Sequence, residues 1–372
     1  MSTTKGGSMS ATKSGSASAT KDDSMSATTV AVRPKSTARA RVRRRVTLFA
    51  TTGLLALFAL LTLSLTTGEI PMPAGTALRA LIGLGDPGDV LVVQEFRAPR
   101  SVAAIVAGAG LGAAGCVLQR LFRNPLASPD VMGITGGASL GAVALIAAGA
   151  SPTLIPVGAL GGGLLAALLL GVFAWGSGLA VTRLVLTGLA VQAGLAAAVN
   201  LMIVRFPAEL AGSALQWTTG SVYGRTWAEV WGAGGAMVPA LATALVMNRQ
   251  LAVLDLGDDS AGALGLRTSS ARLRLLVLAV VLASLAAALA GPVTFVALAV
   301  PHIVRFVTGP PTAASLALAG LTGAVLLLAS DLVVHHLLPI EGLPVGAVTA
   351  TLGAPWLLIL MLRQSSPVQR SQ

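Results

Sequence analysis

The sequence predicts an all-α integral membrane protein with about ten transmembrane helices. Of its 372 residues, 54% are apolar and only 10% are charged, and long stretches without charge recur along most of the chain. A soluble protein needs polar side chains to cover its core, whereas a bilayer requires no such cover over spanning segments. These observations exclude the water-soluble enzyme classes.

Residues 1–45 predict a disordered cytoplasmic tail. Ten of the 25 basic residues lie there, opposed only by Asp22 and Asp23, and the segment is otherwise rich in Ser, Thr, Ala and Gly. Such composition cannot bury a core, and basic residues next to a span favour the cytoplasmic side. We interpret the final arginine run as a cluster that sets topology, in preference to a nucleic-acid site. A permease domain over 46–365 and a short C-terminal tail over 366–372 complete the predicted organisation.

The spans follow from uncharged stretches long enough to cross about 30 Å of hydrocarbon. The first begins directly after Arg45, the fifth is bracketed by Arg183 and Arg205, and the last by Glu341 and Arg363. The eighth is separated from the seventh only by Gly291-Pro292, which we expect to form a tight turn. In chain order, the predicted spans are 46–66, 101–119, 131–150, 155–178, 184–204, 230–248, 275–290, 293–309, 312–330 and 343–362.

The positive-inside rule gives the orientation. An even number of spans places both termini on one side, and with the tail in the cytoplasm twenty of the 25 basic residues lie inside. The cytoplasmic basic residues outside the tail are Arg120, Arg123, Arg183, Arg249, Arg267, Arg272, Arg274, Arg305, Arg363 and Arg370. Those on the opposite side are Arg79, Arg97, Arg100, Arg205 and Arg225.

Glycine patterns within the spans predict close helix packing. Gly108 with Gly112, and Gly137 with Gly141, have GxxxG spacing, which lets helix backbones approach in lipid. The stretch 110–115 spells GxGxxG and 137–141 spells GxSxG, the patterns of dinucleotide sites and of hydrolase nucleophiles. Both lie in apolar helical stretches without a preceding strand, so we assign them to packing.

The sequence predicts no catalytic residue, no metal site and no cofactor. The single cysteine allows no disulfide, and the three histidines and the pair Asp258-Asp259 lack the further ligands that a metal ion requires. All four lysines lie in the tail, so the membrane domain cannot contain a GxxxxGK[ST] phosphate loop. If transport uses ATP, a partner subunit must bind it.

Several ordered motifs over roughly 45–365 resemble the iron-siderophore permease family, the FecCD-type membrane subunits of ABC importers, which also include the cobalamin permease. The motifs, with their first and last residues, are Arg97-Ala-Pro-Arg100, Arg123-Asn-Pro-Leu-Ala-Ser-Pro-Asp130, Trp217 with Gly220-Ser221, Leu256-Gly-Asp-Asp259, Gly291-Pro-Val-Thr-Phe295, Pro301-His302 with Arg305, Asp331, and Leu343-Pro-Val-Gly346 with Gly353-Ala-Pro355.

The resemblance implies a type II ABC importer permease fold with ten spans in the cytoplasmic membrane. It further implies a second permease subunit, in a homo- or heterodimer, two ATPase subunits, an extracytoplasmic binding protein, and a ferric siderophore or related iron chelate as cargo. Cobalamin or haem is the alternative cargo. A stand-alone secondary transporter or channel is the alternative class, against which the loop 249–271 and the lack of an ion-pair relay argue.

The resemblance also places an ATPase-coupling loop at 249–271. Gly257 can end one helix, Asp258 and Asp259 favour the N-terminus of the next, and small apolar side chains follow that could fit a partner's groove. A solvated loop is the alternative. The coupling residues predicted are Leu256, Gly257, Asp258, Asp259, Ala261, Leu264 and Gly265.

Arg97, Arg100 and His335 are predicted to dock the binding protein, because the family's arginines at these positions receive acidic side chains. His335 stands where relatives often carry a third arginine, so docking here could depend on pH. Structural or snorkelling arginines at a helix end are the alternative.

The remaining predicted motif residues lie within or next to the spans. Asp331 is costly in a bilayer unless it is paired, so a bond to a neighbouring helix and a role in the pathway are both open. Pro301 is expected to kink its helix, with His302 and Arg305 reaching polar groups near the inner side. Asn124 and Pro125 complete the set of structural or translocation residues.

Overall fold

A computed structural model describes residues 35–174, 181–336 and 343–364. The chain divides into two compact units, Met1–Ala40 and Arg41–Gln372. Of the first unit only the helical residues 35–40 are described. Most of the predicted N-terminal tail, and the predicted C-terminal tail 366–372, lie outside the described residues.

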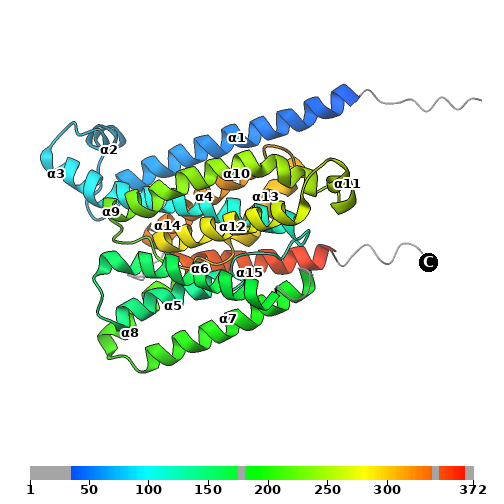
Figure 1. Cartoon of the computed structure of the whole chain (residues 1–372). Coiled ribbons are helices and arrows are strands. Elements are labelled where there is room, and N and C mark those ends of the chain that lie inside the picture. The colour runs from blue at the N-terminus through cyan, green and yellow to red at the C-terminus, as the bar shows by residue number, and fades with distance from the viewer. Residues whose placement is uncertain (1–34, 175–180, 337–342, 365–372) are drawn as a thin grey trace, which may run out of the picture. The chain divides into compact units, whose positions relative to one another are not determined.

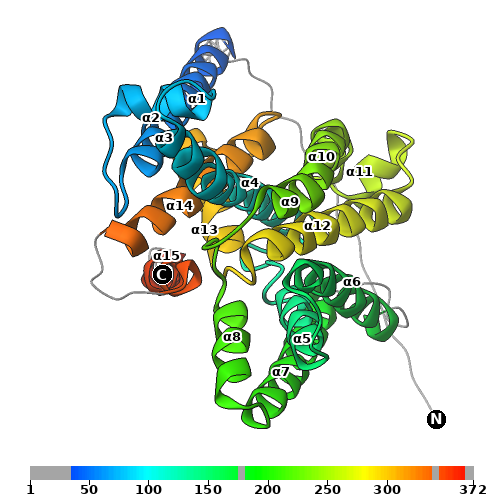
Figure 2. The ribbon, with the colours of Figure 1, turned by 90° about the vertical axis from the view of Figure 1, so that its left-hand side faces the viewer.

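The described chain is helical and contains no strand in those ranges, as Figures 1 and 2 show. The α-helices are α1 (Lys35–Thr66), α2 (Ala74–Leu81), α3 (Pro87–Leu91), α4 (Ala98–Leu121), α5 (Ile134–Ala147), α6 (Ile155–Ala174), α7 (Val181–Val204), α8 (Ala208–Thr219), α9 (Trp227–Glu229), α10 (Gly235–Leu254), α11 (Asp258–Ala263), α12 (Thr268–Ala290), α13 (Val296–Thr308), α14 (Ser315–His336) and α15 (Val345–Gln364). The short helices of other types are η1 (Val92–Arg97), η2 (Pro152–Leu154) and η4 (Val230–Gly234).

Ten of these helices correspond to the predicted spans. Seven are long and apolar enough to cross a membrane, and three shorter apolar helices, α5, α13 and part of α15, match the other predicted spans. At about 1.5 Å per residue, the 14 residues of α5 and the 13 of α13 are too short to cross alone. Irregular segments precede both helices, and such backbone is tolerated at membrane depth where protein buries it.

Helix α1 begins within the segment predicted as a disordered tail. We expected disorder through residue 45, but α1 begins at Lys35. Alanine and arginine are strong helix formers, and the apolar run that follows already supplies a helical nucleus. The basic segment 35–45 therefore extends the first helix.

Helix α4 forms the centre of the second unit. It packs against α10, α12, α13 and α14, and Figure 2 shows these helices grouped around it. Within the most apolar window of Pro87–Leu121, 78% of residues are buried, against 0% for the corresponding window of α1. Protein therefore surrounds α4, whereas α1 packs one side on the core and exposes apolar side chains such as Leu55 and Phe58 on the other, as a lipid-facing helix does.

The glycine pairs pack helices as predicted. A Cβ added to Gly112 would lie 2.2 Å from the carbonyl oxygen of Ala319 in α14, and one on Gly141 would lie 2.0 Å from that of Gly158 in α6. No side chain fits such gaps, so these pairs require glycine. The GxGxxG glycines all lie inside α4, where the assignment to packing is confirmed.

Gly291-Pro292 forms the predicted turn between two helices. Helix α12 ends at Ala290, Gly291 has a φ of +69°, and α13 begins at Val296. The positive φ favours glycine, and the proline cannot continue the helix.

The helices define two ends of the second unit, which Figure 1 separates clearly. We call them the α8 end, which carries α2, α3, α8 and α9, and the α11 end, where α10 ends and α12 begins. Helix α4 runs from the α8 end to the α11 end. Among described residues, the arginines predicted outside belong to segments of the α8 end, and Arg120, Arg123, Arg267 and Arg272 belong to segments of the α11 end.

Candidate functional site

The predicted coupling loop contains a short helix. Helix α10 ends at Leu254, Gly257 adopts a φ of +109°, and α11 begins at Asp258. Asp258 and Asp259 occupy the first turn of α11, where carboxylates interact favourably with the helix dipole. A second glycine with positive φ, Gly265, follows α11. The helix end and the helix start inferred from sequence are thus confirmed.

The side chains of this loop divide into an outward and an inward set. Leu256 and Leu264 are 62% and 66% exposed, so both are available to a partner. Ala261 is fully buried in the main core, which corrects its predicted place on the partner-facing surface. The carboxylate of Asp258 pairs with Arg272 at 2.6 Å, and both side chains are partly exposed.

A buried polar network next to α11 was missed by the sequence reasoning. Arg120, in the last turn of α4, donates to Asn248 Oδ1 at 2.7 Å and to Asp255 Oδ2 at 2.7 and 3.2 Å. The only sequence signal was an arginine and an asparagine near the ends of apolar stretches, which does not reveal that they meet.

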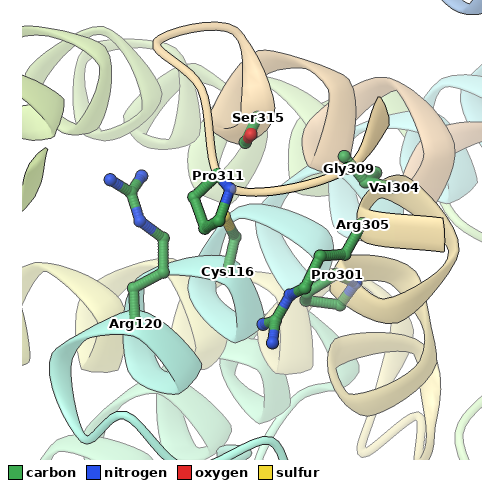
Figure 3. A pocket seen from close by; sticks show the side chains of 8 residues that line it. All are labelled: Cys116, Arg120, Pro301, Val304, Arg305, Gly309, Pro311 and Ser315. Carbon is green, nitrogen blue, oxygen red and sulfur yellow. The ribbon is translucent and has the colours of Figure 1, made fainter. Parts of the chain in front are cut away.

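A small pocket opens beside this network (Figure 3). The two guanidinium groups that line it, those of Arg120 and Arg305, point away from each other on either side of Cys116 and Pro311. They therefore do not converge on one ligand. In the described ranges no group of three or more His, Cys, Asp or Glu side chains could hold a metal ion. The lining residues are Cys116, Arg120, Pro301, Val304, Arg305, Gly309, Pro311 and Ser315.

Three motif residues of α13 have local roles in the structure. Pro301 has no N–H for the carbonyl of Ala297, and Gly115 of α4 approaches that carbonyl closely. The Nδ1 atom of His302 lies 2.8 Å from the Leu298 carbonyl oxygen, within the same helix. Arg305 reaches Gln119 Oε1 in α4 at 3.4 Å. The Ala297 and Arg305 contacts connect α13 to α4, whereas that of His302 stays within α13.

Asn124 and Pro125 form part of the turn after α4. The side-chain oxygen of Asn124 accepts from the backbone N–H of Leu126 at 2.9 Å. The backbone N–H of Asn124 donates to the backbone carbonyl oxygen of Gln119 at 3.1 Å. Asparagine forms such turns readily, and Pro125 lacks an N–H with which to continue the helix. This pair lies in the turn that follows the end of α4 at Leu121 and leads toward α5.

At the α8 end, Arg100 and Asp331 form a two-pronged ion pair. Arg100 Nε and Nη2 lie 2.8 and 2.7 Å from the carboxylate oxygens, and both side chains are largely buried. Of the two roles considered for Asp331, the structure shows the bond to a neighbouring helix, since the pair joins α14 to α4. Such fork geometry is characteristic of strong arginine–carboxylate pairs.

The other two predicted docking residues lie at the same end. Arg97 donates to the backbone carbonyls of Leu65, at 2.7 Å, and Ile70. His335 meets the ring of Tyr223 edge-on at 5.8 Å, and Arg100 lies over the same ring at 5.4 Å. Tyr223 therefore brings Arg100 and His335 together, a role that the sequence reasoning did not assign to it.

Comparison with known proteins finds membrane permeases that are similar to this chain. The family model described as "FecCD transport family" matches residues 55–363. The ferric enterobactin permease FepG of Escherichia coli (strain K12) is 39% identical over 81% of this chain and 91% of its own. The achromobactin permease CbrC of Dickeya dadantii (strain 3937) is 40% identical over 84% and 90%, and the cobalamin permease BtuC of Halobacterium salinarum is 36% identical over 79% and 80%.

Solved structures show the same fold. An inward-facing metal-chelate type ABC transporter matches with a TM-score of 0.75 and 27% identity, over 84% of this chain and 98% of its own. PsaBC from Streptococcus pneumoniae matches with a TM-score of 0.52 at 20% identity, over 73% of this chain and 92% of its own.

Proposed function

Because this chain belongs to the FecCD transport family, we propose that it is the membrane permease of an ABC importer that carries a ferric siderophore into the cell. The observation that carries the proposal is the 39–40% identity to permeases for ferric enterobactin and achromobactin, spread over more than four-fifths of the chain. The family model extends from residue 55, inside the first predicted span, to residue 363, just after the last.

The chain requires ATPase subunits supplied by other proteins. Accumulating cargo needs an energy source, because a ligand shifts a conformational equilibrium only by its difference in affinity for the two states. All four lysines lie in the N-terminal tail, which leaves the membrane domain without a phosphate loop. The ATPase would dock on α11, where Leu256 and Leu264 are exposed beside Asp259. The chain itself would hold no cofactor and catalyse no reaction.

The α8 end would receive the extracytoplasmic binding protein. Arg97 donates to neutral carbonyls and has the carboxylate of Asp89 nearby without an ion pair among the described residues, whereas Asp331 binds Arg100 directly. Long-range attraction of an acidic partner would therefore depend more on Arg97 than on Arg100. Arg100 and His335 would contribute short-range contacts through the surface they share on Tyr223.

The α11 end would face the cytoplasm. The arginine-rich start of α1 and the arginines around α11 then follow the positive-inside rule. Both termini would share this side, because ten spans return the chain to where it began. A second permease subunit, identical or related, would complete the transport pathway.

Cobalamin is the second candidate cargo. The permease of that transporter in Halobacterium salinarum is 36% identical to this chain, close to the value for the siderophore permeases. The family includes both kinds of permease, so membership alone does not separate the two cargoes.

Uptake into cells tests the proposal. Radiolabelled ferric enterobactin, ferric citrate and cobalamin would be supplied to cells with the wild-type chain, a deletion, or the double variant Asp258→Arg/Asp259→Arg, each with its own ATPase. We expect both altered strains to lose uptake of a ferric chelate while the binding protein still captures it. Normal uptake of every ferric chelate in a deletion strain without a redundant permease would contradict the siderophore assignment. Loss of cobalamin uptake alone would establish the second candidate.

A further inference from the structure

The α11 end contains a second functional element besides the exposed loop, namely the buried network around Arg120. Its members are Arg120, Arg123, Asn248 and Asp255. We propose that this Arg120 network transmits movement of α11 to α4, with Arg120 as the positioning residue; the inference rests on the proposed function as an ATP-driven permease.

The network joins segments that are distant in sequence. Besides binding Arg120, Asn248 donates through Nδ2 to the carbonyl oxygen of Ala313 at 2.7 Å, just before α14. Arg123 donates through Nη2 to the carbonyl oxygen of Leu254 at 2.7 Å, at the end of α10. Helix α4 is therefore bonded to the end of α10 at three positions, and through Asn248 to the approach of α14.

Arg123 adopts a strained backbone conformation at this point. Its φ of +49° lies in the left-handed region, which a helix end usually fills with glycine. A glycine would relieve the strain but could not reach Leu254. The residue at this position is therefore strained in its backbone but contributes a side-chain hydrogen bond to α10, which glycine could not make.

Asp255 connects the network to α11. It precedes Asp258 by three residues, and its side chain is 32% exposed whereas that of Arg120 is 5% exposed. Only Leu256 and Gly257 lie between Asp255 and α11. A force applied to α11 would therefore reach a buried arginine through a very short length of chain.

The other polar connection of α11 is weaker. The pair Asp258–Arg272 ties α11 to α12, but its side chains are 51% and 31% exposed, and water competes for exposed ion pairs. Ala261 packs into the core through apolar contact, which has no preferred direction. In the described part of the chain, the directional buried link from this loop runs to α4.

A displacement of α4 would move its neighbours. Gly112 and Gly115 hold its backbone against Ala319 of α14 and Ala297 of α13, and Gln119 donates to the carbonyl oxygen of Leu298 at 3.0 Å. A buried guanidinium separated from its carboxylate is unfavourable, so the end of α4 should follow Asp255. Packed helices then convert that small shift into a rearrangement of the bundle.

The test separates transmission from structural support. The complete complex, with its ATPase and binding protein, would be reconstituted in proteoliposomes, and ATP hydrolysis and entry of radiolabelled ferric enterobactin or citrate would be measured together. For Arg120→Gln and Asp255→Asn we expect about a tenfold rise in ATP hydrolysed per iron transported, because the buried pair is lost. The control Arg274→Gln should keep the wild-type ratio, since Arg274 is exposed and, among the described residues, its side chain donates to the carbonyl oxygen of Ser270 in its own helix.

A second readout does not depend on the cargo. Cys116 is the only cysteine of the chain and lines the pocket beside Arg120. Trapping the ATPase with ATP and vanadate should change the rate at which N-ethylmaleimide alkylates Cys116 in the wild type. In Asp255→Asn this rate should not change. Asp255→Asn keeps the size of a side chain that is 32% exposed, so this variant should assemble even if Arg120→Gln does not.

The proposal fails if an assembled Asp255→Asn complex keeps the wild-type ratio of ATP to iron, or shows the wild-type change at Cys116. A wild-type complex that moves neither ferric chelate would overturn the proposed cargo. The alkylation measurement would still decide whether the Arg120 network transmits movement.

Discussion

The two ends of α4 each carry an arginine–carboxylate pair, but the pairs lie in different surroundings. At the α8 end, Arg100 and Asp331 are 12% and 4% exposed and join two helices whose backbones already touch at Gly108 and Gly323. At the α11 end, Arg120 binds a carboxylate that is 32% exposed and adjoins a short loop helix. The comparison suggests that the first pair supports a rigid unit and the second connects this unit to a part that moves.

The rigid unit should be most sensitive where α4 and α14 meet. In Gly112→Val, the new Cβ would lie 2.2 Å from the Ala319 carbonyl oxygen, so the helices must separate. We expect a loss of about 4 kcal/mol or more, or no folded protein at all. Thermal unfolding in detergent measures this effect. Gly161→Val in α6 is the control, because nothing lies within 4 Å of its added Cβ. Equal melting temperatures for both variants would refute close α4–α14 packing.

Removing the carboxylate at the α8 end should have the next largest effect. Asp331→Ala leaves Arg100 buried without its ionic partner, which typically costs about 3 kcal/mol. The double variant Arg100→Met/Asp331→Leu should recover much of this stability, because it removes both charges. Melting temperatures of the single and double variants, measured side by side, check the prediction. A double variant less stable than Asp331→Ala would show that the arginine contributes through other contacts.

The exposed pair of α11 should matter least to stability. Asp258→Asn removes its charge from a pair whose side chains are 51% and 31% exposed, and such pairs contribute less than about 1 kcal/mol. We expect no more than a slight shift in melting temperature. A shift as large as that of Asp331→Ala would show that α11 is fixed to α12, and would remove the distinction between the two ends of α4.

The sequence predicted features that depend on local pattern. Uncharged length located all ten helices, GxxxG spacing located two close helix contacts, and Gly257 with two aspartates located α11. Positions set by tertiary contact were not predictable. Ala261 was placed on the wrong face, because a six-residue helix has too few residues to show which side is buried. The bond from Arg120 to Asp255 joins residues 135 positions apart, which no local pattern reveals.

The central claim is that this chain moves a ferric chelate only when a separate ATPase drives it. The most direct measurement is uptake by proteoliposomes that contain the chain, its ATPase subunits and its binding protein. Radiolabelled ferric siderophore is supplied on the side of the binding protein, and ATP is present or absent on the side of the ATPase. The account predicts accumulation that requires ATP and stops when the ATPase is omitted. Equal uptake by the purified chain without any ATPase would contradict it and indicate a stand-alone transporter.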